Sequence, residues 1–154
     1  MALVEKLFSS IDLSDPFFDS LKIDYPEFED WFNRKRDHYA IVSINDSGRI
    51  DGFLYLKEED ESLDDMDPSF PKEQRLKCGT FKIDGHGTKL GERFVSKLIN
   101  CALEKRIKTI YVTIFDKHDG LINLLKSFGF ELCSRKLKET PSGREGVYFK
   151  RVTK

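Results

Sequence analysis

The order of apolar and polar positions along the chain predicts strands and helices over its whole length. Residues 2–8, ALVEKLF, alternate as a short strand does. Ser14-Asp15-Pro16 and Pro26 are helix-start signals, so two short helices should follow this strand. The second of these helices has three aromatic residues on one face: Phe28, Trp31 and Phe32.

The next stretch predicts an antiparallel hairpin followed by a loop. HYAIVSI and RIDGFLYLK, residues 38–44 and 49–57, are strand-like runs on either side of NDSG, whose residues suit a tight reversal. Beyond the hairpin, seven of the ten residues from Glu58 to Asp67 are acidic. Like charges this dense favour an exposed loop between strands. A functional alternative is an acidic lip that attracts an amine-bearing substrate.

The second half of the chain predicts a strand, a helix, a strand, a helix and two closing strands. The strands are RLKCGTFKI (75–83), TIYVTIF (109–115), FELCSRK (130–136) and EGVYFKRV (145–152), with a TPSG turn between the last two. The helices are GERFVSKLINCALEKR (91–106) and DGLINLLKSF (119–128), the latter closed by Gly129. The apolar residues of the first helix form one stripe, which predicts that it lies on a sheet: Phe94, Val95, Leu98, Ile99, Ala102 and Leu103.

Composition and charge limit the classes of function. With 154 residues, 39% of them hydrophobic, we expect a single α/β or α+β domain over residues 1–154. The formal net charge is -1, so the chain has no overall field that would draw it onto nucleic acid or an anionic membrane. We therefore expect neither partner.

Neither the amino terminus nor the cysteines indicate export. Glu5, Asp12 and Asp15 interrupt the apolar residues of the amino terminus, which suits neither a secretory leader nor a membrane span. The three cysteines, Cys78, Cys101 and Cys133, have no metal-ligand or disulfide spacing, and the three histidines are scattered. We expect a cytoplasmic protein without a metal, whose cysteines are small buried side chains.

A glycine-rich segment before the 91–106 helix carries the candidate chemistry. In HGTKLG, residues 86–91, glycines would let an anion approach the free N–H groups of the helix start. Phosphate binding and a plain strand-to-helix turn explain this spacing equally well. A Walker loop is excluded because Glu92 follows Gly91.

A dinucleotide site is the rival phosphate site. Gly85, Gly87 and Gly91 form GxGxxxG, and Asp116 lies near the place of a ribose-binding acid. The glycine spacing is one residue too long, however. The preceding antiparallel hairpin also disagrees with a fold that needs several parallel strands.

The sequence resembles the GCN5-related N-acetyltransferases, the GNAT family. The family order of strand, two helices, three antiparallel strands, helix, strand, helix and two strands matches the predicted elements along nearly the whole chain. The family motif Arg/Gln-x-x-Gly-x-Gly/Ala falls on HGTKLG, and LLKSFGF, residues 124–130, is similar to the later family motif. The resemblance implies a mixed, mostly antiparallel sheet of about seven strands flanked by about four helices.

The resemblance also implies acetyl-CoA as co-substrate. Its pantetheine arm would pair with backbone near Phe81 and Ile83, between the strands at 79–83 and 109–115. His118 stands at the position of a family asparagine that often contacts the cofactor. Its pyrophosphate would lie on residues 86–91, which are His86, Gly87, Thr88, Lys89, Leu90 and Gly91.

The chain departs from the family pattern at several positions. His86 replaces the usual Arg or Gln and Lys89 the middle glycine, while Lys82, Gly85 and Gly87 offer a second register that places the apolar stripe less well. Leu125 stands where many members have the tyrosine that protonates the thiolate. The catalytic residues are thus unknown, and the candidates for acid and base are Glu58, Glu59, Tyr111 and Tyr148.

Three hypotheses follow. The first is an N-acetyltransferase acting as a monomer or homodimer, in which a primary amine of a small molecule or peptide attacks the acetyl-CoA thioester directly. The second is a non-catalytic acyl-CoA-binding or interaction module with the same fold. The third is a dinucleotide-dependent oxidoreductase.

Overall fold

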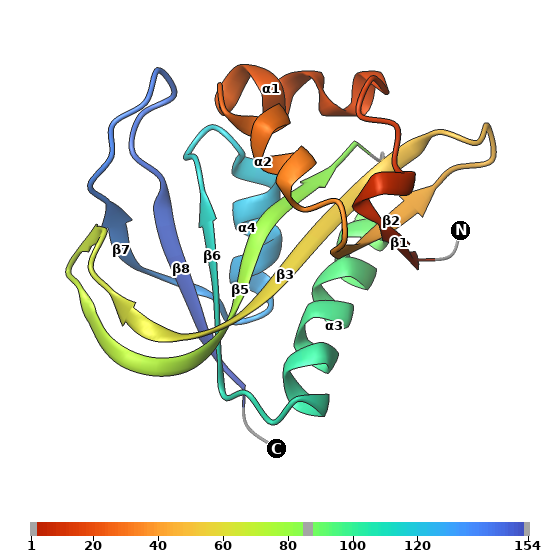
Figure 1. Cartoon of the computed structure of the whole chain (residues 1–154). Coiled ribbons are helices and arrows are strands. Elements are labelled where there is room, and N and C mark those ends of the chain that lie inside the picture. Colours follow the sequence, from red (N-terminus) through yellow and green to blue (C-terminus); the bar gives the residue numbers. More distant parts are fainter. Residues whose placement is uncertain (1–2, 85–87, 153–154) are drawn as a thin grey trace. The chain divides into compact units, whose positions relative to one another are not determined.

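The structure, a computed structural model, describes residues 3–84 and 88–152 and the side chains of 3–84 and 89–152. The chain forms two compact units: unit 1 comprises the described residues of Met1–Tyr55 and Thr80–His86, and unit 2 those of Leu56–Gly79 and Gly87–Lys154. Figure 1 shows the elements in chain order.

The described strands form an eight-stranded sheet in the order β1-β2-β3-β5-β6-β8-β7-β4. Its strands are β1 (Leu3–Leu7), β2 (Tyr39–Ile44), β3 (Ile50–Leu63), β4 (Met66–Asp67), β5 (Phe70–Ile83), β6 (Thr109–Ile114), β7 (Glu131–Lys136) and β8 (Gly146–Arg151). β1 with β2, β2 with β3, β4 with β7, β6 with β8 and β7 with β8 are antiparallel pairs, whereas β5 and β6 are parallel. This mixed order confirms the predicted fold class and excludes the doubly wound sheet of a dinucleotide fold.

Unit 1 is built around an aromatic core. Asp15 accepts a hydrogen bond from the Phe17 N–H at 2.9 Å and so caps a short 3-10 helix, Pro16–Phe18, which leads into α1 (Asp19–Asp24) and α2 (Phe28–Arg34). A second 3-10 turn, Phe8–Ser10, follows β1. Phe8 and Phe32 lie with ring centroids 4.7 Å apart, beside the fully buried Phe18 and Phe53. These rings hold the predicted helix pair on β2 and the first residues of β3.

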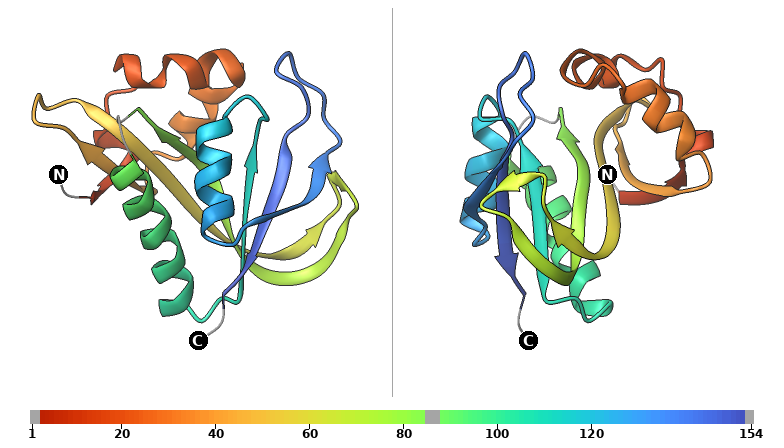
Figure 2. Two further views of the ribbon diagram at one scale, coloured as in Figure 1. Left: turned by 180° about the vertical axis from the view of Figure 1, so that it is seen from behind. Right: turned by 60° about the vertical axis from the view of Figure 1, so that its left-hand side comes forward.

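In unit 2, α3 (Thr88–Glu104) and α4 (Asp119–Ser127) lie on the same face of β6, as the two views of Figure 2 show. The predicted apolar stripe of α3 provides the contact: Phe94, Val95, Leu98 and Ala102 are buried, and Ile99 and Leu103 are half-buried. A second apolar cluster comprises Leu63, Met66, Tyr111 and Val147, with Phe70 and Phe149 packed against it. Gly129 ends α4 with φ +93°, as the glycine signal predicts.

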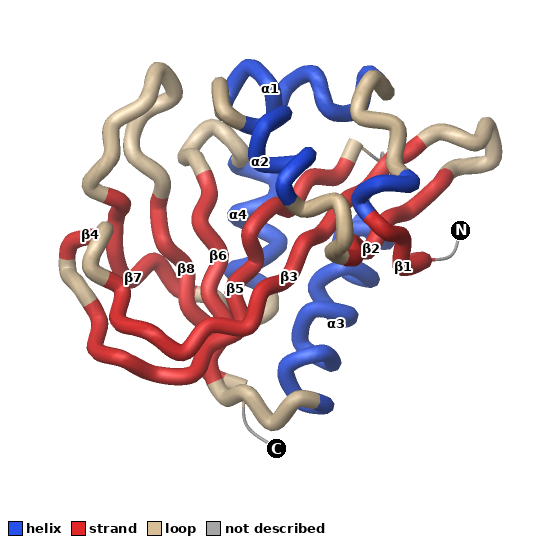
Figure 3. The backbone as a smooth tube through the Cα atoms, viewed as in Figure 1, coloured by secondary structure: helices blue, strands red, loops and turns tan. Residues whose placement is uncertain are grey.

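The prediction of an exposed loop over the acidic run is wrong. β3 continues to Leu63, and β5 begins at Phe70, so the run forms strand and a short return to β7 through β4. Figure 3 shows these long arms as continuous strands that reach β7.

Neighbouring cations, some from the same strand and some from other elements, explain why so many like charges are ordered. Lys105 lies 3.1 Å from Glu58 and Lys57 lies 3.5 Å from Glu59. Asp65 pairs with Lys136. Each cation offsets part of the repulsion that the sequence pattern indicates.

Two further expectations need correction. α3 begins at Thr88, three residues before the predicted 91–106 helix, so Gly91 lies within the helix. Of the three cysteines, none of which is in a disulfide, Cys78 is buried as expected, but Cys101 is only half-buried and Cys133 is exposed. Within the part of the chain that the structure describes, none of the helices combines the length and apolarity that a membrane crossing needs.

Candidate functional site

The first turn of α3 is the candidate phosphate site, and its described residues fit that role. Leu90 is buried with 5% of its surface exposed, so it fixes this turn on the core. Lys89 is exposed beside it and Gly91 is buried. The N–H groups of a first helical turn have no partners within the helix, and the macrodipole favours an anion there. His86, Gly87 and the side chain of Thr88 lie outside the described residues.

The parallel pairing of β5 with β6 is short. Its register joins Leu76–Cys78 to Ile110–Val112, although β5 continues to Ile83 and β6 to Ile114. The candidate cofactor residues Phe81 and Ile83 belong to the part of β5 beyond this register, and both are half-buried.

His118 lies at the start of α4, and Leu125 lies on the buried side of the same helix. His118 is exposed and occupies the N-cap position, where its carbonyl accepts a hydrogen bond from the Ile122 N–H at 3.0 Å. Leu125 is fully buried. The place where a tyrosine acid is usual is therefore part of the apolar core of unit 2.

Two of the four candidate acid and base residues meet in unit 2. The Tyr111 hydroxyl donates a hydrogen bond to Oε1 of Glu59, and only 2% of Tyr111 and 8% of Glu59 are exposed. Lys57 Nζ lies 3.5 Å from the other carboxylate oxygen. Burial first, and then the hydrogen bond and charge of Glu59, raise the pKa of Tyr111 far above its usual range. Tyr111 therefore keeps its proton and acts as a donor to the carboxylate.

The other two candidates are separate from this pair. Glu58 is exposed and pairs with Lys105 on the outside of unit 2. Tyr148 is buried in β8 opposite Val112. Burial and then the charge of Asp116 raise its pKa, against the opposing charge of Arg135.

The pairing of Lys57 with Glu59 was not predicted from the sequence. A signal was present, because residues two apart on a strand point to the same face. The pairing of Glu59 with Tyr111, 52 positions away, had no such local signal.

Unit 1 has a surface pocket of about 410 Å³ with an acidic lining. Asp15, Asp51 and Asp84 contribute carboxylates, Arg49 contributes one cation, and Oδ1 of Asp51 is buried without a hydrogen-bond partner. Among the described residues, no group of three or more His, Cys, Asp and Glu side chains has the arrangement of a metal site.

Comparison with solved structures identifies the fold. An acetyltransferase of the GNAT family from Streptococcus agalactiae aligns over 84% of this chain and 75% of its own, with a TM-score of 0.65 and 19% identity. The chain has the GNAT fold. A GNAT phosphinothricin acetyltransferase from Sinorhizobium meliloti, solved with AcCoA, aligns over 99% of this chain and 89% of its own, with a TM-score of 0.59 and 12% identity.

The NatC complex, solved with a Gag peptide and CoA, contains a chain of this GNAT fold as well. The alignment with that chain covers 99% of this chain and 100% of the NatC chain, with a TM-score of 0.59 and 18% identity. No protein-family model matches the sequence, and neither does any curated protein. The likeness is thus one of structure, and it confirms the fold that the resemblance in sequence implies.

Proposed function

We propose that this GNAT-fold chain is an acetyl-CoA-dependent N-acetyltransferase. The observation that supports it best is the fold itself, with a helix start at Thr88 that follows β5 and has Gly91 in its first turn. Two of the relatives in structure were solved with CoA or AcCoA, which supports the same cofactor here.

We assign the cofactor contacts to the residues that the resemblance implies. The pyrophosphate binds the main chain of residues 86–91, where the exposed ammonium group of Lys89 adds charge attraction. The pantetheine arm contacts the backbone at Phe81 and Ile83, and His118 contacts the cofactor from the start of α4. Acetyl-CoA supplies the activated acetyl group as its thioester.

In the reaction, the nitrogen of a primary amine bonds to the thioester carbon, the carbon–sulfur bond breaks, and coenzyme A leaves as a thiolate that takes up a proton. We assign the role of proton acceptor to Glu59, directly or through a water molecule. Tyr111 positions Glu59, because its raised pKa keeps the hydroxyl a hydrogen-bond donor. Positioning of amine and thioester supplies most of the rate.

The acceptor is an amine-bearing small molecule or a peptide. The relatives support both classes, since one was solved with a peptide and another is a phosphinothricin acetyltransferase. The acidic side chains exposed along β3 give the surface of unit 2 a local negative charge that attracts an amine.

Two measurements test the proposal. Acetyl-CoA should raise the melting temperature, and mass spectrometry should find an acetylated product in a panel of amino acids, polyamines, aminoglycosides and peptides. Lys89→Ala should weaken acetyl-CoA binding by about three- to tenfold, in keeping with loss of one charge-assisted contact. Lys97→Ala, on the same helix but outside its first turn, is the matched control and should bind like the parent chain. An unchanged melting curve in saturating acetyl-CoA would contradict the proposal.

The buried Leu125 favours one second candidate, a non-catalytic acyl-CoA-binding module. This candidate predicts the same shift in melting temperature without any acetylated product. A single amine that is acetylated faster than in a protein-free control would exclude it.

A further inference from the structure

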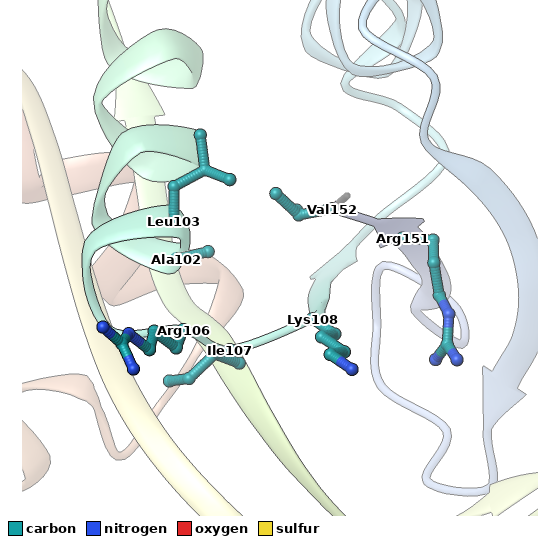
Figure 4. Close-up of a pocket in the computed structure, with 7 residues that line it drawn as sticks. All are labelled: Ala102, Leu103, Arg106, Ile107, Lys108, Arg151 and Val152. Carbon is teal, nitrogen blue, oxygen red and sulfur yellow. The ribbon is translucent and has the colours of Figure 1, made fainter. Parts of the chain in front are cut away.

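Unit 2 has a second pocket, of about 510 Å³, at the carboxyl end of α3. The end of α3, the segment before β6 and the end of β8 form its walls. Its lining residues are Ala102, Leu103, Arg106, Ile107, Lys108, Arg151 and Val152. Figure 4 shows Arg106 and Arg151 on opposite sides of the pocket, with Lys108 between them.

The lining combines an apolar floor with a cationic rim. Four of the residues are apolar, whereas the three charged ones are all basic. Arg151 also contacts Glu73 at 3.3 Å and the Thr109 hydroxyl at 3.1 Å. Arg106 and Lys108 are exposed, and neither has a carboxylate partner within ion-pair distance among the described residues. Three basic residues from three segments therefore line a cavity without an acidic residue in its lining.

The backbone of Arg106 supplies an independent observation. Its φ is 58°, in the left-handed region, where α3 ends with Ile107 N–H bonded to the Ala102 carbonyl at 2.9 Å. Glycine is preferred at this position of a helix end because a side chain there is disfavoured. The helix macrodipole favours a cation nearby, but Lys105 already provides one. A long basic side chain at a position that prefers glycine is what a ligand contact would explain.

We propose that this pocket binds a small organic anion, with a phosphate or carboxylate group on an apolar body. The planar guanidinium group of Arg151 matches either group, the positive charges of Arg106 and Lys108 add attraction at the rim, and the apolar floor accepts the rest of the molecule. The cavity volume lies within the range of small-molecule sites, roughly 300–1,000 Å³. Because α3 has 17 residues, this pocket lies about 25 Å from the first turn of the helix. The site is therefore distinct from the proposed acetyl-CoA site and independent of it.

Three probes of similar size test the proposal in the full chain: phenyl phosphate, phenylacetate and neutral phenylacetamide. Each is titrated with and without saturating acetyl-CoA, while NMR follows the backbone amides of Ile107, Lys108 and Val152. At least one anion should give saturable shifts at these amides in both conditions, and phenylacetamide should give none. The anion that binds with the higher affinity identifies the preferred head group. Shifts of equal size for anions and amide, or no saturable shift for either anion, would overturn the proposal.

Variants separate ligand binding from a structural role. Arg106→Gly relieves the left-handed backbone, so it should raise the melting temperature while weakening binding of the anion about tenfold. Arg106→Gly combined with Lys108→Ala should abolish saturable binding. Lys105→Ala removes one positive charge from the same helix end outside the pocket and should bind within about twofold of the parent chain. Unchanged affinity in the double variant, or equal losses in Lys105→Ala, would contradict the assignment.

Discussion

The hydrogen bond from Tyr111 to Glu59 joins a phenol and a carboxylate that are both shielded from water. A buried carboxylate is stable only with partners, and Lys57 is a second partner of Glu59. Tyr111 and Glu59 therefore affect stability as well as the catalytic step that we propose for them. The two roles require different measurements.

Tyr111→Phe removes one hydrogen-bond donor and leaves the ring in place. We expect the free energy of unfolding to fall by about 1–3 kcal/mol, because the Glu59 carboxylate then loses a buried partner. Urea denaturation measures this change. Tyr148→Phe is the matched control, since Tyr148 is equally buried on β8. The Tyr148 substitution should cost less than about 0.5 kcal/mol.

A catalytic role has a separate readout. If Tyr111 positions Glu59, Tyr111→Phe should lower kcat, while the affinity for acetyl-CoA stays constant. Glu59→Gln should then lower kcat further. Equal kcat values for Glu59→Gln and the parent chain would remove Glu59 from the mechanism.

At the scale of elements, the long arms of β3 and β5 depend on a buried guanidinium group. Only 2% of Arg75 is exposed, and it donates to the carbonyls of Glu61 at 2.9 Å and Pro71 at 2.7 Å. Its Nε lies 3.5 Å from a carboxylate oxygen of Glu73 but has no hydrogen-bond partner. Arg75 thus links residues on both arms of the hairpin.

Arg75→Ala should lower the free energy of unfolding by about 3 kcal/mol or more, because it leaves two buried carbonyls without donors and opens a cavity. Chemical denaturation measures the loss. Arg151→Ala removes an exposed arginine that contacts the same Glu73 and should cost no more than about 1 kcal/mol. Similar losses of unfolding free energy in the two variants would show that the burial of Arg75 does not account for its contribution to stability.

The return of β4 to β7 should be sensitive to acid. Burial acts to raise the pKa of Asp65, but the hydrogen bond and charge of Lys136 outweigh it, so the pKa lies below its usual 3.8. Because the pKa of Asp65 is lowered in the folded state, its contribution to the stability of the fold is fully present above pH 3.8. The contribution is lost as the pH falls through the pKa that Asp65 has in the folded state. Hydrogen exchange at the β4 and β7 amides should therefore quicken in this acidic range. In Lys136→Ala, exchange there should already be fast at neutral pH.

The sequence predicted most elements because their periodicity reflects a single buried face. The α3 stripe and the NDSG turn are of this kind, and both are confirmed. The outer arms of β3 and β5 could not be predicted in this way. Their acidic residues are held by lysines from distant segments, such as Lys105 and Lys136, and no local pattern indicates those pairs.

At the scale of the whole molecule, the order of elements was enough to predict the GNAT fold, whereas the chemistry of the site was not. The glycine motif indicated a cofactor position at α3 because it is a continuous segment of the backbone. The Glu59–Tyr111 pair joins two strands, so either residue alone is an ordinary acid or an ordinary aromatic side chain in the sequence. The contributions of Phe81, Ile83, His86 and His118 to cofactor binding stay predictions.

The unequal exposure of the cysteines has a practical consequence for spectroscopy. Cys133, on β7 in unit 2, is exposed, while Cys78 is buried and Cys101 half-buried, so a thiol-reactive dye should attach to Cys133 first. Burial and then Glu131 raise the pKa of Cys133, and labelling is therefore faster in mildly alkaline buffer. The chain has one tryptophan, Trp31, which belongs to α2 of unit 1. Native fluorescence and one dye thus form a donor–acceptor pair with one member in each unit, and energy transfer between them would report any domain motion that accompanies cofactor uptake.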